Sequence, residues 1–229
     1  MAQIVGHRGA AGYAPENTLL AFQRAMDLGC KAVEMDARLS KDGVAVVFHD
    51  AKVDRMTDGR GLVKKMTVAQ LKALRCPHGQ RIPTLQEVID LCKGKAKMLI
   101  ELKAAGTADA VARLVAENGI ESEVVVLSFK IKLLKRIKRL NPRLKVNYLF
   151  FRKPLRLWGL VKKVPLEYIG PRMKAATPKL VDKAHALGRR VYVYVVNSLS
   201  DGDGFARLNV DAICTDYPKL FLHRKGRRK

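Results

Sequence analysis

Residues 32–49 read AVEMDARLSKDGVAVVFH, two apolar runs joined by the turn Ser40-Lys41-Asp42-Gly43. Parallel strands need a crossover of about a dozen residues or more, and this connection is far shorter. Asp-Gly between two apolar runs is the strongest short-range signal for a β-hairpin. The stretch therefore predicts an antiparallel hairpin whose strands are 32–39 and 44–49.

The rest of the chain alternates short apolar runs with helical patterns. Seven further segments are strand candidates: 4–7, 97–102, 124–129, 145–149, 168–170, 191–196 and 212–215. Helical patterns lie between most of them, at 17–28, 84–92, 108–118, 130–140 and 178–187. Such alternation is typical of a parallel sheet, and about eight units favour a closed barrel. We therefore expect an α/β fold, a TIM-type (β/α)8 barrel with the hairpin inserted in its wall.

The polar segment after the hairpin is longer than a barrel loop usually is. Residues 51–83 contain the run TDGRG at 57–61 and one short helical pattern near 68–74. We place this segment as a short excursion over the barrel mouth. A chain of 229 residues, 48% of them hydrophobic, then suits one barrel domain over 1–229 with 51–83 as a small insertion.

Neither a membrane span nor a secretory signal is expected. The chain has no apolar run of about 18 residues, and its first residues, MAQIVGH, lack the basic and apolar regions of a signal peptide. These features predict a cytoplasmic protein. Cysteine usage agrees, because the four cysteines form no CxxC pair and suit reduced thiols better than disulfides or a zinc site: Cys30, Cys76, Cys92 and Cys214.

The charge is strongly positive, with 44 Lys and Arg against 21 Asp and Glu, a formal +23. A field of this sign attracts phosphates, anionic membrane surfaces and nucleic acids. The imbalance is concentrated, because residues 124–166 contain 13 Lys or Arg and no acidic residue, and the tail at 223–229 is basic as well. Charge alone indicates which partners are attracted and leaves the chemistry open.

The hairpin gathers polar side chains on one face. A two-residue turn at Asp42-Gly43 places Asp36 opposite His49, and opposite residues share a face of the sheet. Glu34 lies two residues before Asp36 and shares that face too. A slipped turn would pair His49 closer to Glu34 and still leave the cluster near. Two neighbouring carboxylates among apolar residues repel each other unless a cation compensates, or unless both point into water. Oxygen-only ligation favours Mg²⁺ or Ca²⁺ over zinc.

Further polar residues stand at the ends of other predicted strands. His7 ends the first predicted strand and Arg8 follows it, while Glu101 lies at the end of the strand at 97–102 and Lys103 follows that strand. The carboxyl ends of barrel strands surround the active-site mouth, so these groups converge with the hairpin cluster. Carboxylates, histidines and cations together suit phosphoryl chemistry, in which a metal and the cations hold the phosphate charge and histidines move protons.

An ordered set of short motifs closely resembles the signature of the glycerophosphodiester phosphodiesterase family. In chain order the motifs are His7-Arg8-Gly9, Pro15-Glu16-Asn17-Thr18, Glu34-Met35-Asp36, Lys41-Asp42-Gly43, His49-Asp50, Thr57-Asp58-Gly59, Ile82-Pro83-Thr84-Leu85, Glu101-Leu102-Lys103, Ser128-Phe129 and Thr215-Asp216-Tyr217-Pro218. They cover nearly the whole chain. The resemblance implies hydrolysis of a small-molecule glycerophosphodiester to glycerol 3-phosphate and an alcohol.

The resemblance also implies roles for individual residues. It assigns metal binding to Glu34, Asp36 and Glu101, and acid–base catalysis to His7 and His49. Phosphate or substrate binding falls to Arg8 and Lys103, which would hold the phosphate, and to Glu16 and Asn17, which would support the site around Arg8. Asn17 alternatively suits the N-cap of a helix over 18–28. The attacking group stays open, because water and the substrate's glycerol hydroxyl, through a cyclic phosphate, need the same acid, base and metal.

One position departs from the family pattern. Family members commonly carry Trp near the last strands, and this chain has Tyr194 at that place, before Val196-Asn197. Tyrosine keeps an aromatic wall but changes its size and adds a hydroxyl, which bears on the fit of the glycerol moiety. Simple barrel packing is the alternative interpretation of Tyr194.

The basic surface supports two other hypotheses. The amphipathic pattern at 155–164, with Trp158, and the basic tail would hold the enzyme at anionic membranes, where it would act on lysophospholipids as a lysophospholipase D. An ordinary outer barrel helix with a solvated basic face is the favoured alternative. A nucleic-acid-binding barrel follows from charge alone, but no binding module is recognisable and aromatic residues are only 6% of the chain, so no specific nucleic acid is expected.

Overall fold

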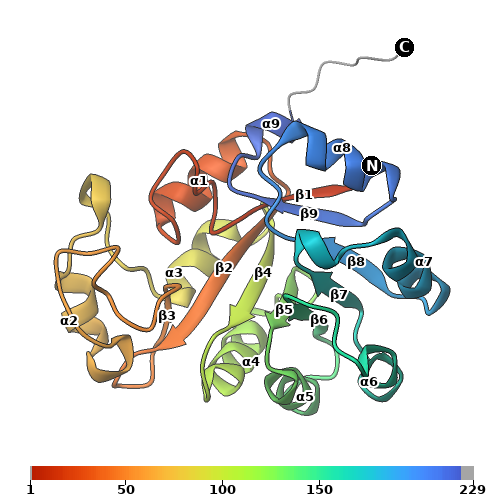
Figure 1. Ribbon diagram of the computed structural model, residues 1–229. Helices are drawn as coiled ribbons and strands as arrows, with labels where there is room; N and C mark the ends of the chain where they lie inside the picture. Colours follow the sequence, from red (N-terminus) through yellow and green to blue (C-terminus); the bar gives the residue numbers. More distant parts are fainter. Residues whose placement is uncertain (1, 223–229) are drawn as a thin grey trace.

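A closed ring of parallel strands forms the centre of the molecule (Figure 1). The computed structural model describes residues 2–222. Its strands are β1 (Gln3–Gly6), β2 (Ala32–Leu39), β3 (Ala45–Val47), β4 (Lys97–Leu102), β5 (Val124–Ser128), β6 (Lys145–Phe150), β7 (Tyr168–Pro171), β8 (Arg190–Val193) and β9 (Ala212–Thr215). The ring closes because β1 pairs with both β2 and β9, and β3 is the extra strand beside β2. The predicted eight-stranded barrel with one added strand is confirmed.

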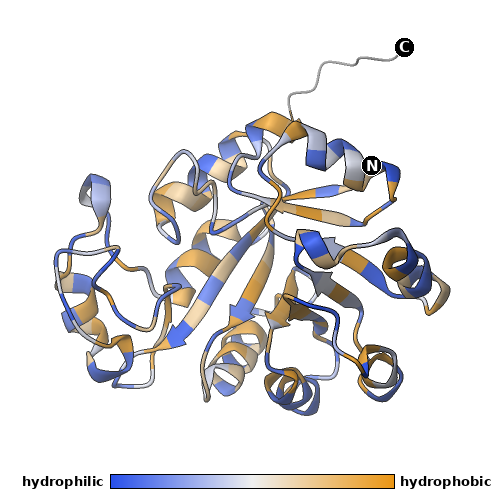
Figure 2. Cartoon of the chain, viewed as in Figure 1, coloured by the Kyte–Doolittle hydropathy of each residue, from blue (hydrophilic) through white to orange (hydrophobic). Residues whose placement is uncertain are grey.

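Helices surround the ring on its outside (Figure 1). They are α1 (Leu19–Asp27), α2 (Val68–Ala73), α3 (Leu85–Cys92), α4 (Thr107–Asn118), α5 (Ile131–Leu140), α6 (Leu157–Lys163), α7 (Pro178–Ala186), α8 (Leu199–Arg207) and α9 (Lys219–Leu222), with short 3-10 turns η1 (Val63–Lys65), η2 (Pro77–Gly79) and η3 (Met173–Ala175). Figure 2 shows orange, hydrophobic residues along the strands and blue patches on the outer helices. This pattern is expected where helices bury one face on a parallel sheet.

Alternation along the strands decides which side chains reach the barrel interior. Leu99, Leu127 and Tyr192 pack together inside the ring, whereas Ile100 belongs to the larger core beneath the outer helices. Because successive strand residues point to opposite faces, Glu101 shares the inner face with Leu99. The sequence pattern of β4 thus sends a carboxylate into the mouth of the barrel.

The hairpin forms with a different register from the expected one. Ser40 N–H donates to Val44 O at 3.0 Å, and Gly43 N–H donates to Ser40 O at 3.1 Å, so the loop has three residues. Gly43 has φ 77°, a left-handed conformation that suits a three-residue hairpin loop. Phe48 N–H therefore donates to Asp36 O, and His49 lies beyond β3. The predicted pairing of Asp36 with His49 was wrong by one residue.

The excursion after β3 builds a small apolar cluster of its own. Val46 and Phe48 of the hairpin pack there with excursion residues that include Val53, Leu71 and Ile82. Figure 1 shows the segment as an orange and yellow lobe at the left of the barrel, beside β3. The short helix expected near 68–74 is α2, whose N-cap Thr67 forms a reciprocal capping box with Gln70.

Helix α6 is an ordinary outer helix of the barrel. Leu157 and Val161 on its apolar face are buried against the core, and Trp158 is half-buried beside them. That face therefore contacts the barrel, and a membrane contact through it does not fit the structure. The basic tail that completed the membrane hypothesis, residues 223–229, lies outside the described residues.

The cysteine thiols and the helix lengths of the described residues bear on disulfide bonds and membrane spans. The four cysteines are all buried and free, in agreement with the predicted thiols: Cys30, Cys76, Cys92 and Cys214. Across residues 2–222, every helix is too short or too polar to cross a membrane.

The loop geometry of the hairpin predicts opposite effects for two glycine substitutions. Gly43→Ala should lower the free energy of unfolding by about 1 kcal/mol, because an L-residue is strained at positive φ even where space is open. Gly159→Ala in α6, also in open space, should raise it by about 0.5–1 kcal/mol through helix propensity. Urea unfolding of both variants measures the difference, and equal effects would contradict the left-handed loop.

Candidate active site

Three carboxylates meet at the carboxyl ends of β2 and β4. Asp36 and Glu101 are direct neighbours in the parallel register of these strands, and Glu34 lies one inward-facing position before Asp36. Each side chain is almost fully buried, with no residue more than 8% exposed. Their carboxylate oxygens lie within 4.8 Å of one another. The predicted gathering of Glu34, Asp36 and Glu101 is thus what the fold produces.

Crowding of these carboxylates shifts their ionisation in opposite directions. Burial, together with the charges of Asp36 and Glu101, raises the pKa of Glu34 well above its usual range. Burial and the charge of Asp36 raise the pKa of Glu101 to about 7. Burial also acts to raise the pKa of Asp36, but Lys103, Arg8 and other neighbours outweigh it and lower that pKa. Asp36 is therefore the carboxylate that stays ionised, and its two neighbours hold protons most readily when no cation is bound.

Two cations stand against the carboxylates on one side. Arg8 donates its backbone N–H to Glu34 at 3.0 Å, and its guanidinium reaches Glu16 at 2.8 Å and Asp36 at 3.3 Å. Lys103 Nζ lies 2.9 Å from Glu101 and 3.3 Å from Asp36. Burial acts to lower the pKa of Lys103, but Asp36 and Glu101 outweigh it and raise that pKa, so the ammonium stays charged.

Asn17 holds Asp36 in place instead of capping a helix. Its Nδ2 donates to Asp36 Oδ2 at 2.8 Å, and its Oδ1 accepts from the Asp36 backbone N–H at 3.2 Å. The N-cap of α1 is Thr18, whose hydroxyl accepts from Ala21 N–H. Asn17 has φ 57° and Arg8 φ 49°, and the Asn17 N–H donates to Arg8 O at 3.0 Å. Two adjacent loops thus keep rare left-handed residues where they touch the carboxylates.

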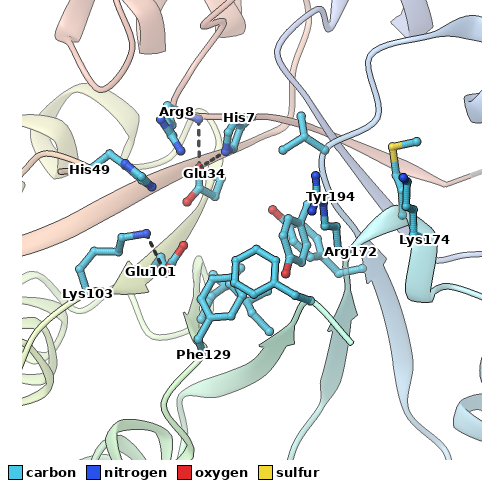
Figure 3. A pocket seen from close by; sticks show the side chains of 16 residues that line it. His7, Arg8, Glu34, His49, Glu101, Lys103, Phe129, Arg172, Lys174 and Tyr194 are labelled. Carbon is cyan, nitrogen blue, oxygen red and sulfur yellow. Dashed lines mark hydrogen bonds and ion pairs between the residues drawn. The ribbon is translucent and has the colours of Figure 1, made fainter. Parts of the chain in front are cut away.

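Each of the two histidines forms a hydrogen bond with an aspartate. His7 Nδ1 lies 2.7 Å from Asp216 Oδ1, and His49 Nδ1 lies 2.6 Å from Asp50 Oδ1. A carboxylate only accepts hydrogen bonds, so Nδ1 carries the proton in both rings and Nε2 is left for the cavity. The His7 Nε2 lies 3.9 Å from Glu34 Oε2. Figure 3 shows the two imidazoles on opposite sides of Glu34.

Asp216 and Asp50, the partners of the two histidines, belong to motifs quoted from the sequence but were not assigned a role there. Asn197 Nδ2 donates to Asp216 at 2.6 Å, and Arg55 Nε donates to Asp50 at 2.7 Å. Arg55 also reaches Glu16 at 2.6 Å, so the excursion is tied to the rim of the site. Barrel closure was the available signal for Asp216, because it brings the end of β9 beside β1 and His7.

A cavity of about 410 Å³ opens above the carboxylates. His7, Arg8, His49 and Lys103 line one side, and Tyr194 contributes to the wall (Figure 3). The lining residues that were not assigned from the sequence include two aromatic and two basic side chains: Phe129, Phe151, Arg172 and Lys174. Figure 3 places Arg172 and Lys174 away from Lys103 and His49, across the cavity.

Tyr194 presents a polar atom that the protein does not satisfy. Its ring packs edge-on against Phe129, with ring centroids 5.9 Å apart, and stacks near Tyr192. Its hydroxyl is buried without a hydrogen-bond partner in the structure. Burial and the charge of Glu101 raise the pKa of Tyr194, so the hydroxyl keeps its proton and remains a donor. Packing in the barrel thus accounts for the Tyr194 ring and leaves its hydroxyl without a partner, which is uncommon for a buried polar group.

The carboxylate cluster suits a hard divalent cation. Its ligand atoms are all oxygens, they converge within one coordination sphere, and they are removed from water. Three ionised carboxylates beside Arg8 and Lys103 carry one uncompensated negative charge. A bound divalent ion would reverse that balance and would let Glu34 and Glu101 ionise together in the buried site.

The geometry agrees with comparisons to known proteins. The model of the glycerophosphoryl diester phosphodiesterase family matches residues 7–220. This chain belongs to that family. A glycerophosphodiester phosphodiesterase of Caldanaerobacter subterraneus is 32% identical and covers 97% of this chain and 98% of its own length. The predicted class, a phosphoric diester hydrolase, is confirmed.

Solved structures of family members share the barrel over its full extent. A phosphodiesterase of Oleispira antarctica, in complex with the product sn-glycerol-3-phosphate, has a TM-score of 0.92 and 28% identity, covering 96% of this chain and 95% of its own. A Silicibacter pomeroyi protein described as a putative glycerophosphoryl diester phosphodiesterase has a TM-score of 0.88 and 30% identity, covering 95% of this chain and 91% of its own. The family assignment and the fold thus agree.

The raised pKa of Glu101 predicts a pH-dependent stability of the metal-free protein. A folded-state pKa of about 7 means that this residue stabilises the fold below its ordinary value of about 4.5 and loses that contribution as pH rises through 7. In EDTA, the free energy of unfolding of Glu101→Gln relative to that of wild type should be about 1–3 kcal/mol higher at pH 8 than at pH 4.5. Urea unfolding at both pH values measures this gain.

Glu117→Gln is the matched control, because Glu117 is exposed on α4 and forms only a surface ion pair. That variant should track wild type at both pH values. A Glu101→Gln variant that lost stability relative to wild type as pH rose would contradict the direction of the shift.

Proposed function

We propose that the chain hydrolyses glycerophosphodiesters to glycerol 3-phosphate and an alcohol, with Mg²⁺ or Ca²⁺ as cofactor and His7 and His49 as the acid–base pair. The observation that carries this proposal is the buried carboxylate trio at the base of a cavity that also holds two histidine–aspartate pairs. The bound sn-glycerol-3-phosphate of the Oleispira antarctica structure supports the same substrate class.

Charge balance explains why a phosphodiester fits this site. Glu34, Asp36 and Glu101 would hold the cation, and Arg8 and Lys103 stand beside them as fixed positive groups. Cation, carboxylates, guanidinium and ammonium together carry one positive charge. A phosphodiester carries one negative charge and completes the balance. When bound, the cation polarises a phosphoryl oxygen and stabilises the charge that develops on it.

The two histidines are placed to move the protons. Burial lowers the pKa of His49, and the cations Lys103 and Arg8 act in the same direction, so its Nε2 is free to accept a proton near pH 7. We assign it the proton of the attacking hydroxyl, whether from water or from the substrate's glycerol moiety. His7, oriented by Asp216, presents Nε2 from the other side of Glu34. In the imidazolium form, which carries a proton on Nε2 as well as on Nδ1, it would pass the Nε2 proton to the leaving oxygen and return to the neutral ring.

Glu16, Asn17 and Tyr194 complete the assignment. Glu16 orients the Arg8 guanidinium against the phosphate, and Asn17 supports the site through Asp36 more than through Arg8. The buried, unpartnered hydroxyl of Tyr194 would donate a hydrogen bond to the glycerol moiety. The cavity has the three carboxylates at its base and basic residues at its sides. This arrangement does not resemble a groove that binds nucleic acid.

A coupled assay for glycerol 3-phosphate release from glycerophosphocholine and glycerophosphoethanolamine tests this proposal. Wild type should turn over at least one of them with Mg²⁺ or Ca²⁺ and lose activity in EDTA. His7→Ala and His49→Ala should each lower kcat by about 10²–10⁴-fold, because proton transfer in the transition state is lost.

His185→Ala is the matched control, since His185 pairs with Asp211 outside the cavity, and it should keep wild-type kcat. Full activity in EDTA would refute the metal role. Equal kcat for His49→Ala and His185→Ala would refute the acid–base assignment.

A further inference from the structure

The loop between β6 and α6, residues 151–156, exposes large apolar side chains beside the active-site mouth. Phe151 is 59% exposed and Leu155 is fully exposed, the two highest values among the large apolar residues of the described chain. Both lie on this one loop, four positions apart. Single exposed leucines are common on soluble proteins, but two such extremes on one short loop call for a partner that shields them.

Cations surround these apolar side chains. Arg152, Lys153 and Arg156 are exposed on the same loop, and Arg172 and Lys174 are exposed on the neighbouring segment after β7. From residue 124 to residue 181 the chain has a single acidic residue, Glu167. That residue stands just before β7, at the amino end of the strand, so the barrel separates it from the mouth. The surface at the carboxyl ends of β5, β6 and β7 is therefore basic, and it also exposes large apolar side chains.

The loop is continuous with the cavity. Phe151 lines the cavity, and its ring stacks on Phe129 with centroids 4.6 Å apart and an interplanar angle of 19°. Leu127 and Leu149 extend this apolar wall inward. An apolar path thus runs from the inside of the cavity along Phe151 to the loop, on which Leu155 is the outermost side chain.

We propose that the β6–α6 loop docks the barrel mouth onto an anionic lipid bilayer. Leu155 and the outer edge of Phe151 enter the apolar boundary, while Arg152, Lys153 and Arg156 contact anionic headgroups. Such a combination of buried apolar area and clustered cations is what peripheral membrane binding requires. Nucleic acid would satisfy the cations but leaves a fully exposed leucine in water.

This surface differs from the apolar face of α6, which is buried against the barrel. Docking through the loop turns the cavity toward the bilayer. Phosphodiesters held at that surface then reach the carboxylate trio without crossing bulk water, a consequence that rests on the proposed function. The docking itself does not depend on any catalytic activity.

Vesicle sedimentation with the full chain tests the docking. Wild type should bind phosphatidylcholine vesicles that contain phosphatidylglycerol and should bind pure phosphatidylcholine vesicles far less. Leu155→Ser should weaken binding by roughly tenfold, the scale expected when one leucine is withdrawn from an apolar phase. Leu140→Ser, a surface leucine at the end of α5, is the matched control and should bind as wild type does.

Two double charge-reversal variants distinguish docking through the β6–α6 loop from a general attraction of the basic protein to anionic vesicles. Arg152→Glu/Lys153→Glu should abolish vesicle binding, whereas Lys95→Glu/Lys97→Glu makes the same change of net charge at the amino end of β4 and should retain most of it. All four variants should keep wild-type turnover of soluble glycerophosphocholine. Absence of vesicle binding by wild type, or equal binding by Leu155→Ser and Leu140→Ser, would overturn the proposal, even if the diester is turned over.

Discussion

Three buried carboxylates repel one another at the mouth of this barrel, and the surrounding structure has to compensate that repulsion. Glu34, Asp36 and Glu101 converge because β2 and β4 are neighbours in register and both send alternate residues inward. Apolar residues at these positions would make an ordinary barrel layer. Carboxylates there raise each other's proton affinity, so the fold needs cations nearby. Arg8 and Lys103 supply part of that charge, and a bound divalent ion would supply the rest.

Backbone geometry around the trio follows from the same requirement. Arg8 turns into the left-handed region after β1, which lets its backbone N–H and its guanidinium reach two different carboxylates. Asn17 adopts the same conformation, and its side-chain amide forms hydrogen bonds with both the carboxylate and the backbone N–H of Asp36. Such conformations are costly for residues other than glycine and persist where surrounding contacts hold them, which is common at functional sites. Local strain here is coupled to the placement of charge.

Periodicity and motif order predicted the barrel, the hairpin and the convergence of the site, because these depend on which strand face a residue occupies. The hairpin register depended on where Gly43 adopts positive φ, and the Asp-Gly dipeptide alone does not distinguish a two-residue from a three-residue loop. Helix α8 was not predicted, since Gly202 and Gly204 weaken its pattern. Pairings such as His7 with Asp216 join the chain's two ends and require the closed ring.

Calorimetric titration of the EDTA-treated protein tests most directly whether Glu34, Asp36 and Glu101 form a cation site. Mg²⁺ or Ca²⁺ should bind with a stoichiometry of one ion per chain, and Glu34→Gln should abolish saturable binding while the variant stays folded by circular dichroism. Binding should also release protons near pH 7, because Glu101 is partly protonated before the ion arrives. A wild-type titration without saturable heat, or one unchanged in Glu34→Gln, would contradict the account.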